Sequence, residues 1–411
     1  MKRPKLLFLT QTLPYPPHGG VENRTFNILR LLSEHFEVTA LCFYRKGGAV
    51  RGRIGEAVSA LSAYGNVEAF PIPQEHSKLR LLWDHARSLI AHTVYTRFAY
   101  QSQRFSSRLT SLLQQDDFAL IHMDSMDLSF YLPMLAGRRV ICTHHNVESA
   151  LLRRRAPAER PALKRAYVRF QARLTEAEER RWCPRVRLNV CVSDRDAEDL
   201  RTIAQGGNYI VVPNGVDVDF FVPDAARGVA EQSGIVFVGG TSWFPNRDAL
   251  GYFAETLLPL IRQQHPGVSV TWVGKATPGE REYYSSIHGI TMTGYVPDVR
   301  PHAWKGACYV VPLRVGGGTR LKIVDGWAMG KAVVSTSVGC EGLAAVDGAN
   351  ILIRDEPQSF ADAVCKVLTD PQLRSRLGQA ARETAVSTYS WKKIGAGMHE
   401  RYDSLLNGAD S

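Results

Sequence analysis

Residues 314–336, RVGGGTRLKIVDGWAMGKAVVST, combine a glycine-rich turn with charged side chains that suit phosphate binding. The glycines at 316–318 allow a tight turn and a close approach of the backbone to a ligand. A helix beginning near Arg320, with Thr319 as its N-cap, would direct free N–H groups and the positive end of its dipole at an anion. Arg320 and Lys322 would add formal charge. This chemistry suits a nucleoside diphosphate and would stabilise a departing one.

Asp325 follows Lys322 by three residues, so the two side chains share one face of the predicted helix. Asp325 is too far along the helix to interact with its N-terminal dipole. Placed in a cleft, its carboxylate would accept hydrogen bonds from a ribose. The alternative is a simple surface ion pair between Lys322 and Asp325. A glycine-rich turn alone does not decide between these interpretations.

Two glycine pairs lie at the ends of other predicted strands. Gly19 and Gly20 follow the first strand and a proline-rich loop, and they precede an amphipathic helix. They do not form the G-x-G-x-x-G pattern of dinucleotide-binding folds. His18 could face a ligand there or be a structural loop residue. Gly239 and Gly240 follow a later strand and precede another helix, which would place backbone amides at the edge of that sheet.

Polar residues also follow the strand in the segment RVICTHHNVES. Polar groups at the carboxyl end of a parallel strand are more often functional than packed. His144 and His145 are adjacent and point to opposite sides, so at most one faces a ligand. Asn146 and Glu148 come directly after them. We expect no metal here, because no third ligand has suitable spacing.

The elements that would position these residues are short runs of Val, Ile and Leu, which alternate with helical patterns. Continuous apolar runs are typical of strands covered on both faces, and alternation with helices predicts parallel sheets. The series restarts after residues 218–234, so we expect two doubly wound α/β domains whose carboxyl edges face a deep cleft. The predicted strands are 5–10, 38–44, 66–72, 119–124, 139–145, 188–193, 209–214, 234–240, 268–274, 290–295, 308–313, 332–337 and 350–353.

Composition excludes several classes of protein. The chain has 411 residues, 45% of them hydrophobic, which predicts two or three ordered domains. Its apolar stretches are too short to span a membrane, and its N-terminal run is too short for a signal peptide. The seven scattered cysteines predict buried free thiols in a reducing cytosol. The chain contains neither a P-loop motif nor a G-x-S-x-G elbow, which disfavours ATPase, kinase and serine hydrolase chemistry.

The formal net charge of +10 is compatible with anionic partners of several kinds. The arginine-rich residues 153–181 lack the interleaved aromatics and fold signatures of nucleic-acid modules, so we expect no nucleic-acid partner. Two interpretations stay open. One is a solvated helix face whose arginines pair with Glu176, Glu178 and Glu179, and the other is a face that lies on an anionic membrane.

Taken together, six segments resemble those of retaining glycosyltransferases of family 4, which have the two-domain GT-B fold. They span nearly the whole chain in the family's order, and the nearest branch is similar to sugar transferases of bacterial exopolysaccharide gene clusters. The resemblance implies an acceptor-binding domain of residues 1–215, completed by a returning C-terminal helix of residues 389–411, and a donor-binding domain of residues 216–388. The segments are HGGVENRTFNILRLL, HHNVES, VCVSDRDAEDL, VVPNGVDVDFF, FVGGTSWFPNRDAL and GGGTRLKIVDGWAMGKAVVSTSVGCEGL.

The resemblance also implies roles for single residues. The amide of the Gly20 loop would meet the donor phosphates or sugar, and His145 matches a histidine that contacts the transferred sugar. Arg320 and Lys322 would contact the diphosphate. Asp325 matches the second glutamate of the family's E-x7-E motif, which binds the ribose hydroxyls.

The first glutamate of that motif would fall at Gly317, where its carboxylate is missing. Backbone amides from Gly317 and Gly318 to Thr319 would then have to supply the contacts near the transferred sugar. The remaining candidates, on the acceptor side, are His18, Asn146 and Glu148.

The implied activity is transfer of a sugar from a nucleoside-diphosphate sugar, with UDP preferred and GDP as the alternative, to a sugar or lipid-linked sugar. Transfer would retain the anomeric configuration without metal or cofactor. The enzyme would be cytoplasmic, with peripheral membrane contact through its basic N-terminal domain. Two alternatives stay open: a non-catalytic nucleotide-binding member of a polysaccharide assembly complex, suggested by Gly317, and a nucleotide-sugar 2-epimerase. An epimerase would need carboxylates in the cleft, and we find no convincing set in the sequence.

Overall fold

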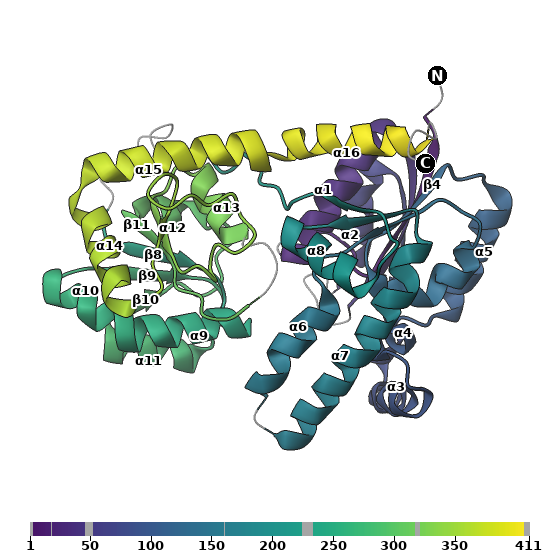
Figure 1. The fold of residues 1–411 in the computed structure, drawn as a ribbon, viewed down its shortest axis with the longest axis horizontal. Coiled ribbons are helices and arrows are strands. Elements are labelled where there is room, and N and C mark those ends of the chain that lie inside the picture. The colour runs from purple at the N-terminus through teal and green to yellow at the C-terminus, as the bar shows by residue number, and fades with distance from the viewer. Residues whose placement is uncertain are drawn as a thin grey trace. The chain divides into compact units, whose positions relative to one another are not determined.

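The computed structural model describes residues 3–17, 19–45, 52–159, 161–223, 233–316 and 321–406. The chain divides into two compact units, each built around its own parallel sheet (Figure 1). Unit 1 comprises Met1–Pro213 and Gly395–Ser411, and unit 2 comprises Asn214–Ile394. The expectation of two doubly wound α/β units is therefore confirmed.

Unit 1 contains a seven-stranded parallel sheet in the order β3-β2-β1-β4-β5-β6-β7. Its central strands are buried along their whole length, as expected for continuous apolar runs with helices on both faces. The order reverses between β1 and β4, which places a switch point of the sheet beside the start of α1. The strands are β1 (Lys5–Thr10), β2 (Glu37–Tyr44), β3 (Asn66–Pro71), β4 (Leu120–Met123), β5 (Val140–Thr143), β6 (Leu188–Cys191) and β7 (Tyr209–Val211).

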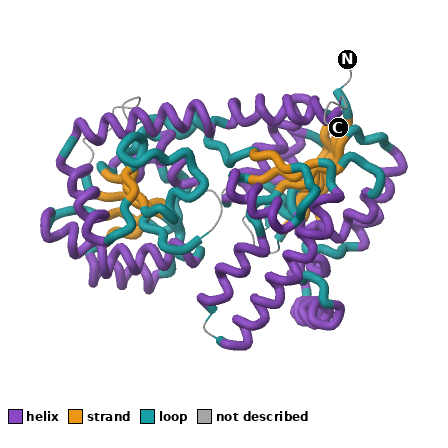
Figure 2. The backbone as a smooth tube through the Cα atoms, in the orientation of Figure 1, coloured by secondary structure: helices purple, strands orange, loops and turns teal. Residues whose placement is uncertain are grey.

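The helices of unit 1 cover both faces of this sheet (Figure 2). A 3-10 segment, η3 (Met126–Leu135), follows β4 and interrupts the alternation of strands and α-helices. The α-helices are α1 (Gly20–His35), α2 (Ile54–Leu61), α3 (Lys78–Ala91), α4 (Tyr95–Ala99), α5 (Gln103–Gln115), α6 (Glu148–Arg155), α7 (Ala162–Trp182), α8 (Asp194–Ile203) and the part of α16 (Trp391–Leu406) that begins at Gly395.

Unit 2 contains a six-stranded parallel sheet in the order β10-β9-β8-β11-β12-β13. Trp272 is fully buried and stacks on Phe237, with 3.7 Å between ring centroids. The strands are β8 (Ile235–Val238), β9 (Val270–Val273), β10 (Ile290–Met292), β11 (Cys308–Val311), β12 (Val333–Ser335) and β13 (Leu352–Ile353). The helices are α9 (Phe244–Tyr252), α10 (Leu258–Gln264), α11 (Pro278–His288), α12 (Arg300–Lys305), α13 (Leu321–Ala328), α14 (Pro357–Thr369) and α15 (Pro371–Thr384).

The sequence placed residues 1–215 and 389–411 in the first domain, and the boundaries of unit 1 differ from these by a few residues. The reason is a pairing between two distant segments: the Val216 amide donates to the Tyr389 carbonyl at 2.7 Å, and the Trp391 amide donates to the Val216 carbonyl at 3.3 Å. Gly215 is also required there, because a Cβ atom at this position would approach the Trp391 ring to 2.5 Å. Both segments therefore belong to unit 2.

From Gly395 onward α16 packs in unit 1. Met398 and Tyr402 are buried, and the His399 ring lies 2.8 Å from the Leu31 carbonyl of α1. All seven cysteines are free and buried, as the sequence predicted. Within the described ranges, every helix is too short or too polar to cross a membrane.

Candidate functional site

Asp124 is the centre of the polar residues at the carboxyl edge of the first sheet. It follows β4 directly and is fully buried. Its carboxylate accepts a hydrogen bond from the Thr25 hydroxyl on α1, and its Oδ2 lies 3.3 Å from His145 Nε2. The same His145 Nε2 lies 2.8 Å from the Asp124 carbonyl oxygen. A carbonyl only accepts, so Nε2 carries the proton and, in the neutral ring, Nδ1 is left as an acceptor.

Burial disfavours ionisation of Asp124, yet its pKa is lowered, because His145, His122 and the Thr25 hydroxyl favour the carboxylate. His122 lies between Thr143 Oγ1 and the Tyr402 hydroxyl of α16, at 3.0 Å from each. Burial lowers the pKa of His122 to about 4, so this ring is neutral near pH 7. The last helix of the chain thus completes the polar core beneath the sheet edge.

Arg24 is a second buried charge in this region, on the first turns of α1. Its guanidinium donates to the Val212 carbonyl beyond β7 at 2.8 Å. Burial lowers the pKa of Arg24 to about 10, and attraction to Asp124 opposes that shift. Arg24 therefore remains charged at neutral pH and compensates the buried carboxylate.

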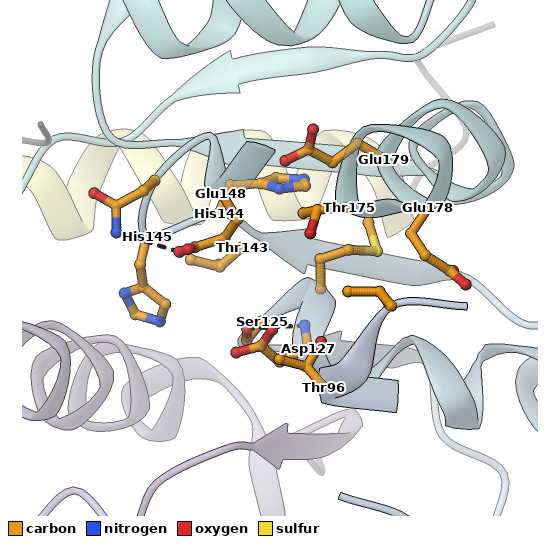
Figure 3. A pocket seen from close by; sticks show the side chains of 13 residues that line it. Thr96, Ser125, Asp127, Thr143, His144, His145, Glu148, Thr175, Glu178 and Glu179 are labelled. Carbon is orange, nitrogen blue, oxygen red and sulfur yellow. Dashed lines mark hydrogen bonds between the residues drawn. The ribbon is translucent and has the colours of Figure 1, made fainter. Parts of the chain in front are cut away.

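His144 and His145 point in different directions, as their adjacent positions predicted (Figure 3). His144 is buried, and its Nε2 lies 2.9 Å from Asn189 Oδ1 of β6. Burial lowers its pKa to about 4. His144 thus has a packing role, whereas the His145 side chain, 6% exposed, lies against Asp124 and lines an adjacent pocket.

A small pocket beside His145 is rich in carboxylates (Figure 3). Its volume of about 20 Å³ suits a water molecule or one hydroxyl group, not a whole sugar. Elements η3, α6 and α7 bring these carboxylates together from distant positions in the sequence. The acidic residues that line the pocket are Asp127, Glu148, Glu178 and Glu179.

Three of these carboxyl groups have raised pKa values. Burial and the nearby Asp127 raise the pKa of Glu148 to about 8, and the Asn146 amide, 3.3 Å away, partly offsets this. Burial raises the pKa of Glu179 to about 7, although the Ser149 amide donates to it at 3.2 Å. Burial also raises the pKa of Asp127. Near neutral pH the pocket therefore holds protonated carboxyl groups that can donate as well as accept hydrogen bonds.

Lys322 lies at the carboxyl edge of the second sheet. It lies on the first turn of α13, after β11, and its Nζ donates to Asn246 Oδ1 of α9 at 2.5 Å. The ammonium is also 4.3 Å from the centre of the Phe237 ring. Asn246 is itself held, because its Nδ2 donates to the Gly240 carbonyl at 2.9 Å. These contacts hold the ammonium beside the end of β8.

Asp325 lies one turn further along α13. Burial raises the pKa of its carboxyl group to about 7, and Lys322 opposes this. Within residues 321–406 and the other described ranges, no hydrogen bond or ion pair to the Asp325 carboxylate is found. The carboxylate is thus available to a ligand.

The glycines predicted to bind the donor have identifiable backbone roles. Gly19 is the N-cap of α1, and Gly20 is its first residue. The Gly239 amide donates to the Val273 carbonyl at 2.7 Å, so it is not available to a ligand. A Cβ atom at Gly239 would approach Lys322 Nζ to 2.8 Å, and one at Gly240 would approach the Lys275 carbonyl to 3.0 Å. Close packing therefore explains this pair without a ligand.

Five predicted residues lie outside the described part of the chain: His18, Gly317, Gly318, Thr319 and Arg320. The sequence patterns did not predict four residues of the first sheet edge: Arg24, Thr25, Asp124 and Asp127. A signal was present for Asp124, because an acidic residue ends the apolar run ALIHMD. No comparable signal marks Arg24, which lies in the middle of an amphipathic helix.

One group of side chains in the described part of the chain has the residue types that bind metal ions. Among the described side chains, Glu34, His35 and His399 have ligand atoms within 4.8 Å of one another. Glu34 and His35 lie at the C-terminal end of α1 and His399 lies on α16, whereas Gly20 and the sheet edge are at the N-terminal end of α1. A helix of 16 residues separates the two places by roughly 24 Å.

Comparison with known families covers most of the chain. Residues 18–220 match the model of "Glycosyltransferase Family 4". Residues 232–370 match the model of "Glycosyl transferases group 1". The two matches follow the division into units and include both sheet edges described above.

Curated relatives align over part of their length. An uncharacterized glycosyltransferase of Methanocaldococcus jannaschii is 31% identical over 98 residues, which are 23% of this chain and 27% of that protein. Phosphatidyl-myo-inositol mannosyltransferase of Mycobacterium tuberculosis is 28% identical over 231 residues, which are 53% of this chain and 59% of that protein. The alignments thus span less than two thirds of these relatives.

Solved structures align over nearly the whole chain. HepE of Anabaena, determined in complex with UDP, has a TM-score of 0.67 and 16% identity, covering 97% of this chain and 100% of that one. WaaG, a glycosyltransferase involved in lipopolysaccharide biosynthesis, has a TM-score of 0.64 and 16% identity, covering 98% and 100%. At this level of identity, the likeness establishes the fold.

Proposed function

We propose, on the premise that this chain belongs to glycosyltransferase family 4 and has the GT-B fold, that it transfers a sugar from a nucleoside-diphosphate sugar to an acceptor hydroxyl. The observation that carries the proposal is the pair Lys322 and Asp325 at the edge of the second sheet. An ammonium held by Asn246 lies one helical turn from a carboxylate without a hydrogen-bond partner among the described residues. A diphosphate and a ribose present the matching charge and hydroxyl groups.

The donor we propose is a UDP-sugar, with a GDP-sugar as the alternative. UDP comes first because the related HepE structures contain UDP or UDP-glucose. Lys322 would contact the diphosphate, and Asp325 would accept hydrogen bonds from the ribose. Arg320, outside the described residues, would add a second cation. Together they would stabilise the charge that develops on the departing diphosphate.

The acceptor we propose is a hydroxyl of a sugar or of a lipid-linked sugar. His145 would contact the transferred sugar through Nδ1, because Nε2 is held by the Asp124 carbonyl. The pocket beside it, with Glu148 and Asp127, is the size of a single hydroxyl group. A relative named phosphatidyl-myo-inositol mannosyltransferase supports a lipid-linked acceptor. We place the reaction in the cytoplasm, where free cysteines such as these stay reduced.

For the reaction we propose front-face attack with retention of configuration and without a metal. The bond from the anomeric carbon to the diphosphate oxygen breaks, the bond to the acceptor oxygen forms on the same face, and the acceptor proton passes to the departing phosphate. Gly317 supports this route, because a family glutamate position carries no carboxylate here. A covalent double displacement would need a carboxylate nucleophile at the transferred sugar.

The test is turnover of purified protein with UDP- and GDP-sugars and a panel of sugar and lipid-linked acceptors. Proton NMR of the product reports the anomeric configuration, and a parallel reaction with EDTA reports the need for a metal. We expect a product of retained configuration that forms equally well with EDTA. Inversion, or loss of activity with EDTA, would contradict the proposed mechanism.

Two other functions give different results in the same assay. A non-catalytic member would bind nucleotide without turnover of any donor. A 2-epimerase would convert the donor sugar in the absence of an acceptor. The family matches and the related structures do not favour either alternative.

A further inference from the structure

The C-terminal end of α1 carries side chains that the proposed reaction does not use. Glu34 and His35 are the last two residues of this helix, and both are exposed. They meet His399 of α16, which comes from the other end of the chain and is only 8% exposed. The ligand atoms of the three side chains lie within 4.8 Å of one another. Two imidazoles and a carboxylate therefore converge from segments that are distant in the sequence.

Close packing of α16 on α1 fixes the position of His399. The two helices lie side by side (Figure 1), and a Cβ atom at Gly395 would collide with the Leu31 side chain. His399 Nε2 lies 2.8 Å from the Leu31 carbonyl oxygen, so this nitrogen carries a proton and donates it. In the neutral ring, Nδ1 then keeps a free lone pair. Metal-binding histidines are typically oriented in this way, by a hydrogen bond from the second ring nitrogen to a carbonyl or carboxylate oxygen.

The second imidazole lies directly against the first. The ring centroids of His35 and His399 are 3.6 Å apart, with 43° between the ring planes. Two protonated rings at this distance would repel each other, so the pair favours at least one neutral ring. A shared metal ion would remove this conflict, because each neutral ring donates a lone pair to the same cation.

The charge around the three side chains also favours a cation. The carbonyl end of α1 is the negative end of its dipole, and the Glu34 carboxylate adds a formal charge. The ion pair of Glu34 with Arg30 is long, at 3.5 Å, and exposed to solvent, so it competes only weakly with a metal ion. Asp403, which is exposed, follows His399 by one turn of α16 and adds a second carboxylate to the surroundings.

The donor atoms indicate which ion fits. Imidazole nitrogens are ligands of zinc and related transition metals, whereas magnesium and calcium prefer oxygen ligands. Two histidines and one carboxylate, with water in the fourth position, are a known set of zinc ligands. Glu34 and His35 are exposed and can reach zinc distances of about 2 Å by rotating their side chains, whereas His399 is already held in place.

We propose that Glu34, His35 and His399 form a binding site for a zinc ion that joins α1 to α16. The contact between Leu31 and His399 spans 368 residues of sequence, so an ion held beside it would close a long loop and stabilise the fold. It would also hold α16 where Tyr402 reaches His122 beneath the first sheet edge. The length of α1 places the ion roughly 24 Å from that edge, so the proposal does not rest on the transfer reaction.

The test is calorimetric titration of zinc into the full chain after dialysis against EDTA. We expect one tight zinc site per chain and no comparable binding of magnesium. His35→Gln removes a ligand at an exposed position, and it should raise the Kd for zinc at least about tenfold. His92→Gln is the matched control, because His92 is also exposed and lies at the end of another helix, α3. It should bind zinc as the wild type does.

A second measurement follows stability and activity. Zinc should raise the Tm of the wild type and of His92→Gln but not that of Glu34→Gln/His35→Gln, because only an intact site gains binding free energy on folding. At a temperature where all three proteins are folded, the double variant should transfer sugar as fast as the wild type. A folded double variant without activity would contradict a structural role for the ion.

Three results would overturn the proposal. One is wild-type protein that binds UDP normally but does not bind zinc, which would leave the proposed transfer reaction intact. Another is equal affinity for zinc in His35→Gln and the wild type. The third comes from cobalt(II) in place of zinc, which absorbs visible light strongly in tetrahedral coordination. Only the weak absorption of octahedral cobalt would mean that the three side chains do not bind one ion together.

Discussion

The two sheet edges carry different kinds of polar group. At the first edge, polar side chains of the protein bond to one another. Asp124 forms hydrogen bonds with Thr25 and His145, and it also interacts electrostatically with His122 and Arg24. At the second, the Lys322 ammonium donates to the neutral side chain of Asn246, and the Asp325 carboxylate lacks a hydrogen-bond partner among the described residues. The carboxylate of the first edge is thus bonded within the protein, whereas that of the second edge is left for a ligand.

This difference has a physical consequence for each edge. A buried carboxylate costs several kcal/mol unless charges and hydrogen bonds compensate it, so changes at the first edge should act on folding. At the second edge a proposed ligand would contact Lys322 and Asp325 directly, so changes there should act on binding. The following variants test this separation.

The variant Arg24→Met should have the largest effect, which is a loss of stability. Removing the guanidinium takes away one of the charges that attract the buried Asp124 carboxylate and also the hydrogen bond to the Val212 carbonyl, and we expect the free energy of unfolding to fall by about 3 kcal/mol. Urea unfolding measures the change. Arg30→Met is the matched control on the same helix, because Arg30 is partly exposed and pairs with Glu34 at 3.5 Å. It should cost no more than about 0.5 kcal/mol. Equal losses in the two variants would show that Arg24 has no special compensating role.

The variant Lys322→Ala should have the second largest effect, which is weaker binding of nucleotide. Loss of a charge-assisted contact with the diphosphate should cost about 2 kcal/mol, which is roughly a thirtyfold rise in Kd for UDP. Isothermal titration calorimetry measures it. Lys366→Ala, at an exposed cation on α14, serves as the control and should bind UDP normally. If Lys322→Ala also binds UDP normally, the ammonium does not contact the phosphates.

A smaller effect is expected on the pH dependence of stability, from Glu148→Gln. The folded-state pKa of Glu148 is raised from 4.5 to about 8, so its protonated form stabilises the fold below pH 4.5, and this contribution is lost as the pH rises through 8. Between about pH 6 and about pH 8 the wild type should lose on the order of 2 kcal/mol more than Glu148→Gln. Glu198→Gln, at an exposed residue of α8, should follow the wild type. Parallel curves for the wild type and Glu148→Gln, measured by urea unfolding, would contradict the raised pKa.

The smallest expected effect separates ribose from phosphate recognition. Asp325→Asn removes the stronger acceptor for the ribose hydroxyls, at a cost of about 1 kcal/mol, or roughly fivefold in Kd for UDP. Binding of 2′-deoxy-UDP should change less, so the preference for UDP over the deoxy analogue should shrink. Calorimetry with both nucleotides measures this. A preference as large as that of the wild type would remove Asp325 from the ribose site.

Local patterns predicted much of the fold. Each strand of both sheets lies in or next to a segment identified by its apolar run, because strands buried on both faces need continuous hydrophobic side chains. The placement of His145, Lys322 and Asp325 at or near strand ends also followed from spacing along the chain. No local pattern predicted the pairing of Val216 with Tyr389 and Trp391, because it joins segments far apart in the sequence.

The sequence by itself determined which elements form and which charged residues end up near the two sheet edges, because hydrophobic period and residue type act over a few neighbours. Only the tertiary structure decided which charges compensate one another. Asp124 depends on α1 and on the turn after β5, and His122 depends on Tyr402 near the end of the chain. It also decided that α3 turns its leucines outward, because Gln171 and Tyr167, on a different helix, bind its polar face. Such choices rest on partners that no local pattern contains.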